Sequence, residues 1–384
     1  MNGELFFILL LLLKWVLGFK ILKTTIDMKQ FRFVAMALCC LASSMVVSCN
    51  QEASVPATLT ERLQTMVNEG KFMYGHQDDL SYGHSWTVTD PQNDPLDRSD
   101  IKMVCGDYPA LLGMDLGGIE MDWESNLDTV SFDLIRRAAQ EHVKRGGIVT
   151  IDWHLRNPLT GGDSWDTSST EVVGSILEGG ELHEMFMGWL TKIADYLETL
   201  EVPFIFRPWH EHSMGFFWWG APYCSAEQYN ALWKMTYDYI QNERGIKDII
   251  WAISPNASPN FPEWIERYPG DEYVDIIGLD YYDQSDAFVE ELDACLAFQQ
   301  QFAQEHGKIL ALTETGFESI PEADWWTETL LPVVEKYQIA YLLTWRNSST
   351  RPLHFYGPFP GAVCEQDFVK FHDSEKTLFL NDIR

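Results

Sequence analysis

Eight short apolar segments constrain the fold of this chain more than any other feature, because each ends in polar or aromatic residues. The segments cover residues 71–77, 110–117, 147–154, 203–211, 248–256, 274–282, 308–316 and 339–347. Continuous apolar runs are typical of strands buried on both faces of a parallel sheet. Apolar residues at helical spacing between them predict helices over 132–145, 184–200, 226–244, 287–306 and 323–337.

This alternation of strand and helix predicts an α/β protein built as a single (β/α)8 TIM barrel. A doubly wound sheet would show the same alternation. It would also be expected to carry a Gly-rich phosphate loop after its first strand, and the sequence has none there. We therefore expect one barrel domain over residues 58–384, with a short tether over 49–57.

The first 48 residues resemble an export signal with two apolar stretches. The stretch over 6–18 is short for a membrane span. The second stretch follows Met28 and two basic residues, and small residues precede Cys49, as in a bacterial lipoprotein cleavage box. We expect residues 1–48 to be a signal segment that starts at Met28, with cleavage before Cys49 and lipidation of that residue. The alternative is a plain secretory signal. Either reading predicts an exported chain, and the lipid would anchor it to the periplasmic or cell-surface face of a bacterial membrane.

The net charge of the chain limits the classes of partner that it is expected to bind. The chain has 57 Asp and Glu against 27 Lys and Arg, a formal net charge of -30. This balance argues against nucleic acid as a partner, because nucleic acid requires a basic surface. A neutral ligand is not repelled, and the 14% of aromatic residues suits one with apolar C–H faces, such as a sugar ring. The cysteines of the predicted domain are widely spaced and form no CxxC metal pattern.

Two glutamates stand out at the expected C-terminal ends of the strands, where barrels of this type place their active sites. Glu211 ends the fourth segment and Glu314 lies near the end of the seventh. A glutamate after a run as apolar as 309–312 is not expected on a solvated face. Two facing carboxyl groups in an aromatic cleft are typical of a glycosidase active site. One group donates a proton to the leaving oxygen, and the other attacks the sugar or orients a water molecule.

The two carboxyl groups would need different pKa values. We expect Arg207 and the Tyr281/Tyr282 pair to stabilise an ionised Glu314 by charge and hydrogen bonding. Low polarity around Trp209 and the aromatic cluster over 216–219 would keep Glu211 protonated.

Several separated segments resemble glycoside hydrolase family 26. They lie, in chain order, at residues 74–77, 153–158, 207–220, 313–316 and 345–347. The resemblance implies a (β/α)8 fold and a retaining double displacement without a cofactor. It also implies β-1,4-linked mannan, glucomannan or galactomannan as the substrate.

Carried over residue by residue, the resemblance makes Glu211 the acid/base and Glu314 the nucleophile. Phe216 stands where many members of the family have Trp, which bears on stacking on the aglycone side. We expect the ring of Trp345 to stack against the sugar under attack. The residues expected to bind substrate are His154, Arg207, His210, Phe216, Trp218, Tyr282 and Trp345.

Structural alternatives exist for these residues. Glu211 could be a buried partner of Arg207, and His154 could be a core residue. A metal at His210 and His212 would need a third ligand, and none is suitably spaced, so we expect no metal. The acidic pairs at 78–79 and 290–291 are expected on solvated faces.

Two functional alternatives accompany the mannan hydrolase. One is a hydrolase of the same fold that cleaves β-1,3-xylan or mixed-linkage β-glucan, and mannobiose release from chain ends is a variant of the main reading. The other is a lipid-anchored glycan-binding protein that has lost catalysis. A binding protein would not need both Glu211 and Glu314.

Overall fold

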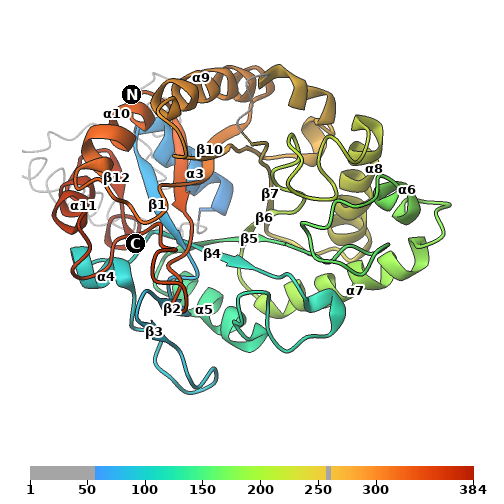
Figure 1. Ribbon diagram of the computed structural model, residues 1–384, viewed down its shortest axis with the longest axis horizontal. Coiled ribbons are helices and arrows are strands. Elements are labelled where there is room, and N and C mark those ends of the chain that lie inside the picture. The colour runs from blue at the N-terminus through green and yellow to red at the C-terminus, as the bar shows by residue number, and fades with distance from the viewer. Residues whose placement is uncertain (1–56, 257–260) are drawn as a thin grey trace, which may run out of the picture. The chain divides into compact units, whose positions relative to one another are not determined.

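A closed barrel of parallel strands forms the centre of the molecule, and helices surround it (Figure 1). The computed structural model describes residues 57–256 and 261–384. The predicted signal segment and Cys49 lie outside the described residues. Within the described part, no helix has the length and apolar character that crossing a bilayer requires.

The barrel strands follow one another in chain order, and each pairs in parallel with its neighbour. Pairing of β11 with both β1 and β10 closes the sheet, which confirms the predicted (β/α)8 fold. A short strand, β9 (Asp280–Tyr282), continues the edge of β8 and also pairs with β10. The barrel strands are β1 (Phe72–Gln77), β4 (Leu111–Asp115), β5 (Ile148–Asp152), β6 (Phe204–Arg207), β7 (Ile249–Ile253), β8 (Ile276–Ile277), β10 (Ile309–Gly316) and β11 (Ile339–Thr344).

Most helices begin and end near their predicted bounds, for local reasons. The Ser131 hydroxyl accepts a bond from Leu134 N at the start of α5, and Ser225 and Gln228 form a capping box at the start of α8. The helices are α3 (Leu59–Asn68), α4 (Asp100–Cys105), α5 (Phe132–Lys144), α6 (Val172–Ile176), α7 (His183–Leu200), α8 (Ala226–Tyr237), α9 (Phe288–His306), α10 (Leu331–Val334) and α11 (Glu365–His372). Outside the barrel, β2 (Tyr82–Gly83) pairs with β3 (Trp86–Thr87), while β12 (Thr377–Leu378) adds to β1.

Two predicted helices differ from the structure in their winding. The segment predicted over 226–244 ends its α-helical part at Tyr237 and continues as a π-helix over Asp238–Glu243. The segment predicted over 323–337 begins with a π-helix over Trp325–Leu330. Pro332 follows there and lacks the N–H that an α-helix would donate one turn back, so only a short α10 follows.

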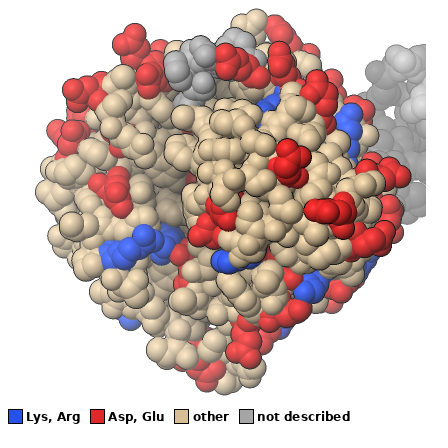
Figure 2. Space-filling model, turned by 45° about the vertical axis from the view of Figure 1, so that its right-hand side comes forward, with Lys and Arg blue, Asp and Glu red and all other residues tan. Residues whose placement is uncertain are grey.

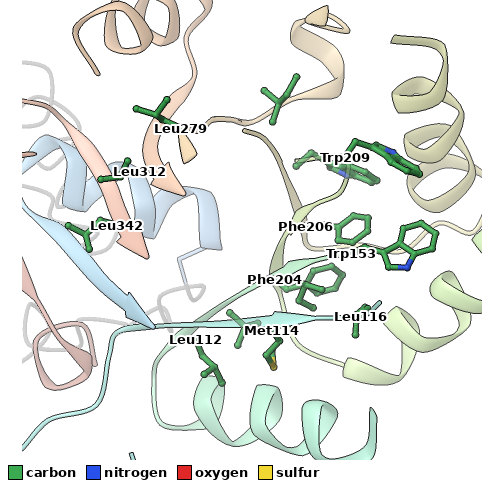
Figure 3. Close-up of a cluster of buried hydrophobic side chains, with 14 of the residues drawn as sticks. Leu112, Met114, Leu116, Trp153, Phe204, Phe206, Trp209, Leu279, Leu312 and Leu342 are labelled. Atoms are coloured by element: carbon green, nitrogen blue, oxygen red, sulfur yellow. The ribbon is translucent and has the colours of Figure 1, made fainter. Parts of the chain in front are cut away.

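The strand side chains alternate between two buried layers. Along β10, Ile309 and Ala311 belong to the cluster inside the barrel, whereas Leu310 and Leu312 pack outward against the helices. The outer layer includes large aromatic side chains between the strands and the helices (Figure 3). This alternation explains why the strands appear as continuous apolar runs in the sequence.

The two ends of the barrel differ. Helix α3 packs Leu63, Met66 and Val67 into the same cluster as the inward-facing strand residues, and it contacts β1, β10 and β11. The end at which the strands begin is therefore filled by apolar side chains. Polar side chains gather at the opposite end, where the strands finish.

Candidate active site

The turn after β6 aims Glu211 into a cavity. The strand ends at Arg207, and both Trp209 and Glu211 then adopt the left-handed region, with φ of 55° and 53°. Such a conformation costs of order 1–3 kcal/mol in a non-glycine residue and persists only where its surroundings hold it. Here Trp209 is fully buried, and Glu211 N donates a hydrogen bond to Ser254 O at 2.7 Å.

Glu314 lies on β10, opposite Asp280 of β9 in the parallel register. Its carboxylate accepts a hydrogen bond from the Tyr282 hydroxyl at 2.7 Å and forms a close ion pair with Arg207. The residue is only 4% exposed. A buried carboxylate with a guanidinium partner and a phenol donor is stabilised in its ionised form, as a nucleophile requires.

Arg207 lies behind Glu314 and does not reach the cavity wall. Its side chain is 2% exposed, and it also pairs with Asp280 Oδ2 at 2.8 Å and donates to Ser254 Oγ at 3.0 Å. The prediction that Arg207 binds substrate is therefore corrected. The interior of the barrel holds this side chain, and its partner is the nucleophile.

The two glutamates meet, as the site hypothesis requires. Oxygen atoms of Glu211, Asp280 and Glu314 all lie within 4.8 Å of one another. Burial and the neighbouring charge of Glu314 raise the pKa of Glu211 to about 7, against the lowering effect of its hydrogen bond with Asn256. Glu211 can therefore hold a proton near neutral pH, as a general acid requires.

A cavity of about 580 Å³ opens over both carboxyl groups. Trp345 at the end of β11 forms part of its wall, and Phe216 is 48% exposed at its rim. Of the residues predicted to bind substrate, the cavity wall includes His154, His210, Phe216, Tyr282 and Trp345.

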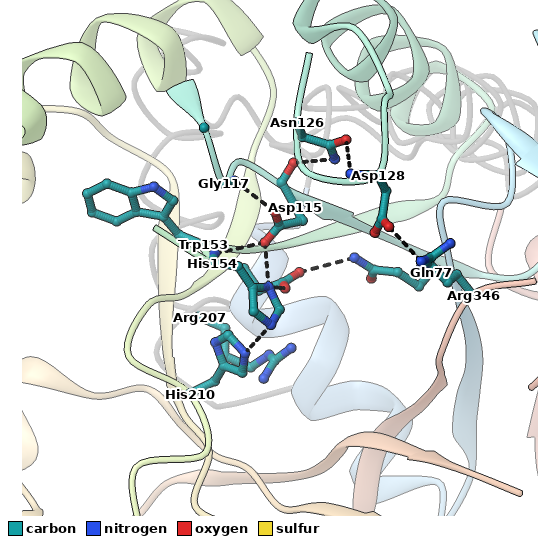
Figure 4. Close-up of polar contacts among 12 residues, drawn as sticks. Gln77, Asp115, Gly117, Asn126, Asp128, Trp153, His154, Arg207, His210 and Arg346 are labelled. Carbon is teal, nitrogen blue, oxygen red and sulfur yellow. Dashed lines mark hydrogen bonds and ion pairs between the residues drawn. The ribbon is translucent and has the colours of Figure 1, made fainter. Parts of the chain in front are cut away.

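Two histidines form one polar chain in this wall (Figure 4). His154 Nδ1 lies 2.8 Å from Asp115 Oδ2 and 3.1 Å from Asp152 Oδ2, and its Nε2 lies 3.0 Å from His210 Nε2. Asp115 and Asp152 end the neighbouring strands β4 and β5 and pair in register. His154 is therefore held by its own strand and the adjacent one.

The prediction that Trp218 binds substrate is also corrected. Trp218 is fully buried and does not line the cavity, because its ring packs edge-on against Trp209 and Trp219. Phe217 lies in the wall in its place and stacks on Trp219 with ring centroids 4.6 Å apart.

The acidic pair Asp78 and Asp79 is not on a solvated face. Both side chains are fully buried, where Asp78 accepts from the Tyr82 hydroxyl at 2.6 Å and Asp79 pairs with His76 at 2.8 Å. The pair at 290–291 is exposed, as predicted, and Glu291 also reaches the cavity wall.

Sequence reasoning missed Trp165, which is 49% exposed in the cavity wall. Its ring lies over that of His154, with centroids 5.3 Å apart and an interplanar angle of 21°. His354 and Tyr356, on the segment after β11, also line the cavity. A tryptophan within the polar, Gly-rich stretch at 160–170 was the available signal, because such a stretch offers little core in which to bury it.

Two groups of side chains bring metal-ligand atoms together, one at Asp152, His154 and His210 and one around Glu314. The atoms of the first group already bind one another. In the second group, the positively charged Arg207 guanidinium pairs with Asp280 and Glu314, as a metal cation would. In both groups the candidate ligand atoms thus face partners within the protein, although His210 Nδ1 and Asp152 Oδ2 have no hydrogen-bond partner among the described residues.

Residues 50–352 match the sequence model of glycosyl hydrolase family 26. The chain belongs to this family. Solved structures of this family show the same barrel fold.

Solved structures and curated relatives of the family include several similar proteins. A β-mannanase from Bacteroides ovatus is 42% identical, with a TM-score of 0.81, over 86% of this chain and 96% of that one. The mannan endo-1,4-β-mannosidase of Bacillus subtilis strain 168 is 32% identical over 71% of this chain and 73% of its own length. One from Bifidobacterium adolescentis is 29% identical over 79% of this chain, which spans about a third (33%) of that longer relative.

Proposed function

We propose that this chain hydrolyses β-1,4-mannosidic bonds in mannan, glucomannan or galactomannan by a retaining double displacement. The observation that carries the proposal is the approach of the Glu211 and Glu314 carboxyl oxygens to within 4.8 Å in one open cavity. Carboxyl groups about 5–5.5 Å apart belong to retaining glycosidases, whereas inverting enzymes need about 6.5–9.5 Å for a water molecule.

In the first step, a Glu314 oxygen forms a bond to the anomeric carbon while the glycosidic C–O bond breaks. Glu211 gives its proton to the departing sugar oxygen, and its raised pKa keeps that proton available. In the second step, Glu211 takes a proton from water, whose oxygen attacks the anomeric carbon and releases Glu314. Two inversions give net retention.

The cavity wall suits a neutral sugar chain. Trp345 and Trp165 offer aromatic faces, and Phe216 stands exposed at the rim. Acidic side chains are spread over much of the visible surface, whereas basic ones form small groups (Figure 2). A neutral polysaccharide is not repelled by this distribution. The curated relatives named above are mannan endo-1,4-β-mannosidases, which supports the same substrate here.

The test is a product profile over time on mannan, galactomannan, β-1,3-xylan and mixed-linkage β-glucan, with proton NMR of the first anomer released. We expect cleavage of the β-mannans and initial release of the β-anomer. A preference for xylan or glucan would refute the substrate, and initial α-anomer would refute retention. Short oligosaccharides of mixed length at early times would indicate internal cleavage, and mannobiose alone would indicate attack at chain ends.

We further propose that the mature chain begins at a lipidated Cys49 and is exported to a bacterial membrane. The support is the sequence alone, in which small residues precede Cys49 after an apolar stretch. Mass spectrometry of the membrane fraction should find a diacylglyceryl group on Cys49, and Cys49→Ser should release the protein. Recovery of wild-type protein without lipid would contradict the anchor.

A further inference from the structure

One imidazole nitrogen in the cavity wall faces two carboxylates. His154 Nδ1 lies 2.8 Å from Asp115 Oδ2 and 3.1 Å from Asp152 Oδ2, and all three side chains are buried. Both neighbours of Nδ1 are carboxylate oxygens, and these oxygens would repel the lone pair of an Nδ1 that carried no hydrogen. Nδ1 therefore carries a hydrogen.

The other ring nitrogen faces a second histidine. His154 Nε2 lies 3.0 Å from His210 Nε2, so one hydrogen must lie between two ring nitrogens. His210 Nδ1 is buried and has no hydrogen-bond partner among the described residues, and no carboxylate pairs with this ring. Burial and the charges of His154 and Arg207 hold the pKa of His210 well below its usual range. His210 is thus neutral and holds one hydrogen. If that hydrogen lies between the rings, His154 is neutral, and if it lies on His210 Nδ1, His154 supplies the hydrogen between the rings and is an imidazolium.

The balance of buried charge favours the imidazolium. Arg207 already pairs with Asp280 and Glu314. Without a cation at His154, Asp115 and Asp152 would be buried carboxylates with no counter-charge of their own, which is costly, and burial already raises the pKa of Asp115 to about 7. Burial alone would lower the pKa of His154, but these two carboxylates raise it well above its usual value. The charged or titratable groups that act on His154 or on its carboxylate partners are Asp78, Asp115, Asp128, Asp152, Arg207, His210 and Glu211.

The charge of His154 acts on the catalytic acid. His154 and Glu211 line the same cavity, and His210 both contacts His154 and precedes Glu211 in the chain. A cation in this buried wall is poorly screened by solvent. It favours the ionised form of Glu211, against the burial and the Glu314 charge that raise the pKa of that residue.

We propose that Asp115 is a positioning residue which, together with Asp152, holds His154 as an imidazolium, and that this buried charge sets the proton affinity of Glu211. The inference rests on the proposed function of Glu211 as acid and base. Glu211 must release its proton in the first step and accept one in the second, so its proton affinity has to stay near the working pH. Asp115 is not part of the cavity wall, so it acts through His154.

The test is Asp115→Asn, which keeps the shape and removes the charge. The matched control is Asp107→Asn, because Asp107 is also buried and accepts bonds from two backbone N–H groups, Tyr108 N and Asn381 N, far from the cavity. Nitrogen-15 NMR of the imidazoles reports the charge of His154, and carbon-13 NMR of the glutamate carboxyls, assigned with Glu211→Gln, reports the titration of Glu211. Neither readout needs turnover.

We expect wild-type His154 to carry hydrogens on both nitrogens at pH 7 and to lose one in Asp115→Asn. The Glu211 titration should then move upward by about one pH unit, because a nearby cation has been removed. The alkaline limb of kcat/KM should move with it, since the free enzyme needs a protonated Glu211. Asp107→Asn should leave both titrations where they are in the wild type.

A neutral His154 in the wild type would overturn the inference, even if Asp115→Asn fails to fold. An unchanged Glu211 titration in a folded Asp115→Asn would also overturn it. A wild-type protein that cleaves none of the β-mannans would refute the proposed function instead, and the two NMR titrations would still decide whether His154 is charged and acts on Glu211.

Discussion

Glu211 and Glu314 are the same residue type in the same cavity, yet the protein surrounds them differently. Glu314 is fixed by a nearly buried ion pair with Arg207 and by a partly buried hydrogen bond from Tyr282. Glu211 sits on a left-handed turn beside aromatic rings and, among the described residues, has no cationic partner within ion-pair distance. The first environment stabilises an anion, whereas the second raises the pKa of Glu211 to about 7.

The comparison shows that the surroundings of each carboxyl group, and not the group itself, decide whether it serves as acid or as nucleophile. The strand register brings Arg207, Asp280 and Glu314 together inside the barrel, where charge can be paired. The turn after β6 lifts Glu211 out of that network towards the open cavity. Each of the following changes removes one element of this contrast.

The largest effect should follow Glu314→Gln. The variant keeps the size of the side chain and loses the nucleophile, so kcat on mannan should fall by at least about 10⁴-fold, as for other catalytic nucleophiles. Circular dichroism and the thermal midpoint should show a folded protein. Turnover at a rate close to that of the wild type would rule out Glu314 as nucleophile.

Glu211→Ala should depend on the leaving group. On mannan, kcat should fall by about 10²–10⁴-fold, the usual contribution of general acid catalysis. On an activated aryl β-mannoside, whose leaving group needs no proton, formation of the glycosyl-enzyme should be nearly unaffected. Steady-state rates on the two substrates and the burst of released aryl alcohol measure this difference, and equal losses on both would contradict the acid assignment.

Arg207→Met should destabilise the fold as well as the site. Removing this guanidinium leaves Asp280 and Glu314 as unpaired buried charges, and breaking such a pair costs about 3–5 kcal/mol. Urea unfolding measures the change in free energy. The matched control is Arg244→Met, which breaks pairs with Asp195 and Glu198 on the surface and should cost below about 1 kcal/mol. Similar losses in the two variants would mean that Arg207 is not a special partner of the nucleophile.

Tyr282→Phe should have the smallest effect of this series. It removes one hydrogen bond to Glu314, and a bond to a charged group is worth about 1.5–3 kcal/mol, which corresponds to a loss of about 10- to 100-fold in kcat/KM. Arg207 still holds the nucleophile, so the reaction should persist. A loss as large as that of Glu314→Gln would show that the tyrosine does more than hold the carboxylate.

The fold was predictable because the sequence repeats one physical pattern. Strands such as β10, buried on both faces, leave a continuous apolar run that ends where Glu314 begins the polar site. The π-helical turns before Pro332 and after Tyr237 were not predictable, since their apolar spacing resembles that of an α-helix over a short stretch.

The position of a site residue was predictable where it stands close to the C-terminal end of an apolar strand, as for Glu211 and Glu314. Arg207 is the last residue of β6, and sequence does not tell whether its long side chain reaches out to the cavity or turns towards Asp280. Trp218 stands in a run of aromatic residues without a period, which leaves the direction of each ring open. Trp165 lies on a loop, where neither strand nor helix periodicity applies.

The most direct test of the central claim is to trap the covalent intermediate and locate it. A 2-deoxy-2-fluoro-β-mannosyl fluoride slows both steps and lets the glycosyl-enzyme accumulate, and peptide mass spectrometry then identifies the labelled residue. The assignment predicts one sugar per chain, attached to Glu314, and no label in Glu314→Gln. A label on Glu211, or full turnover without any covalent label, would contradict the assignment of the two carboxyl groups.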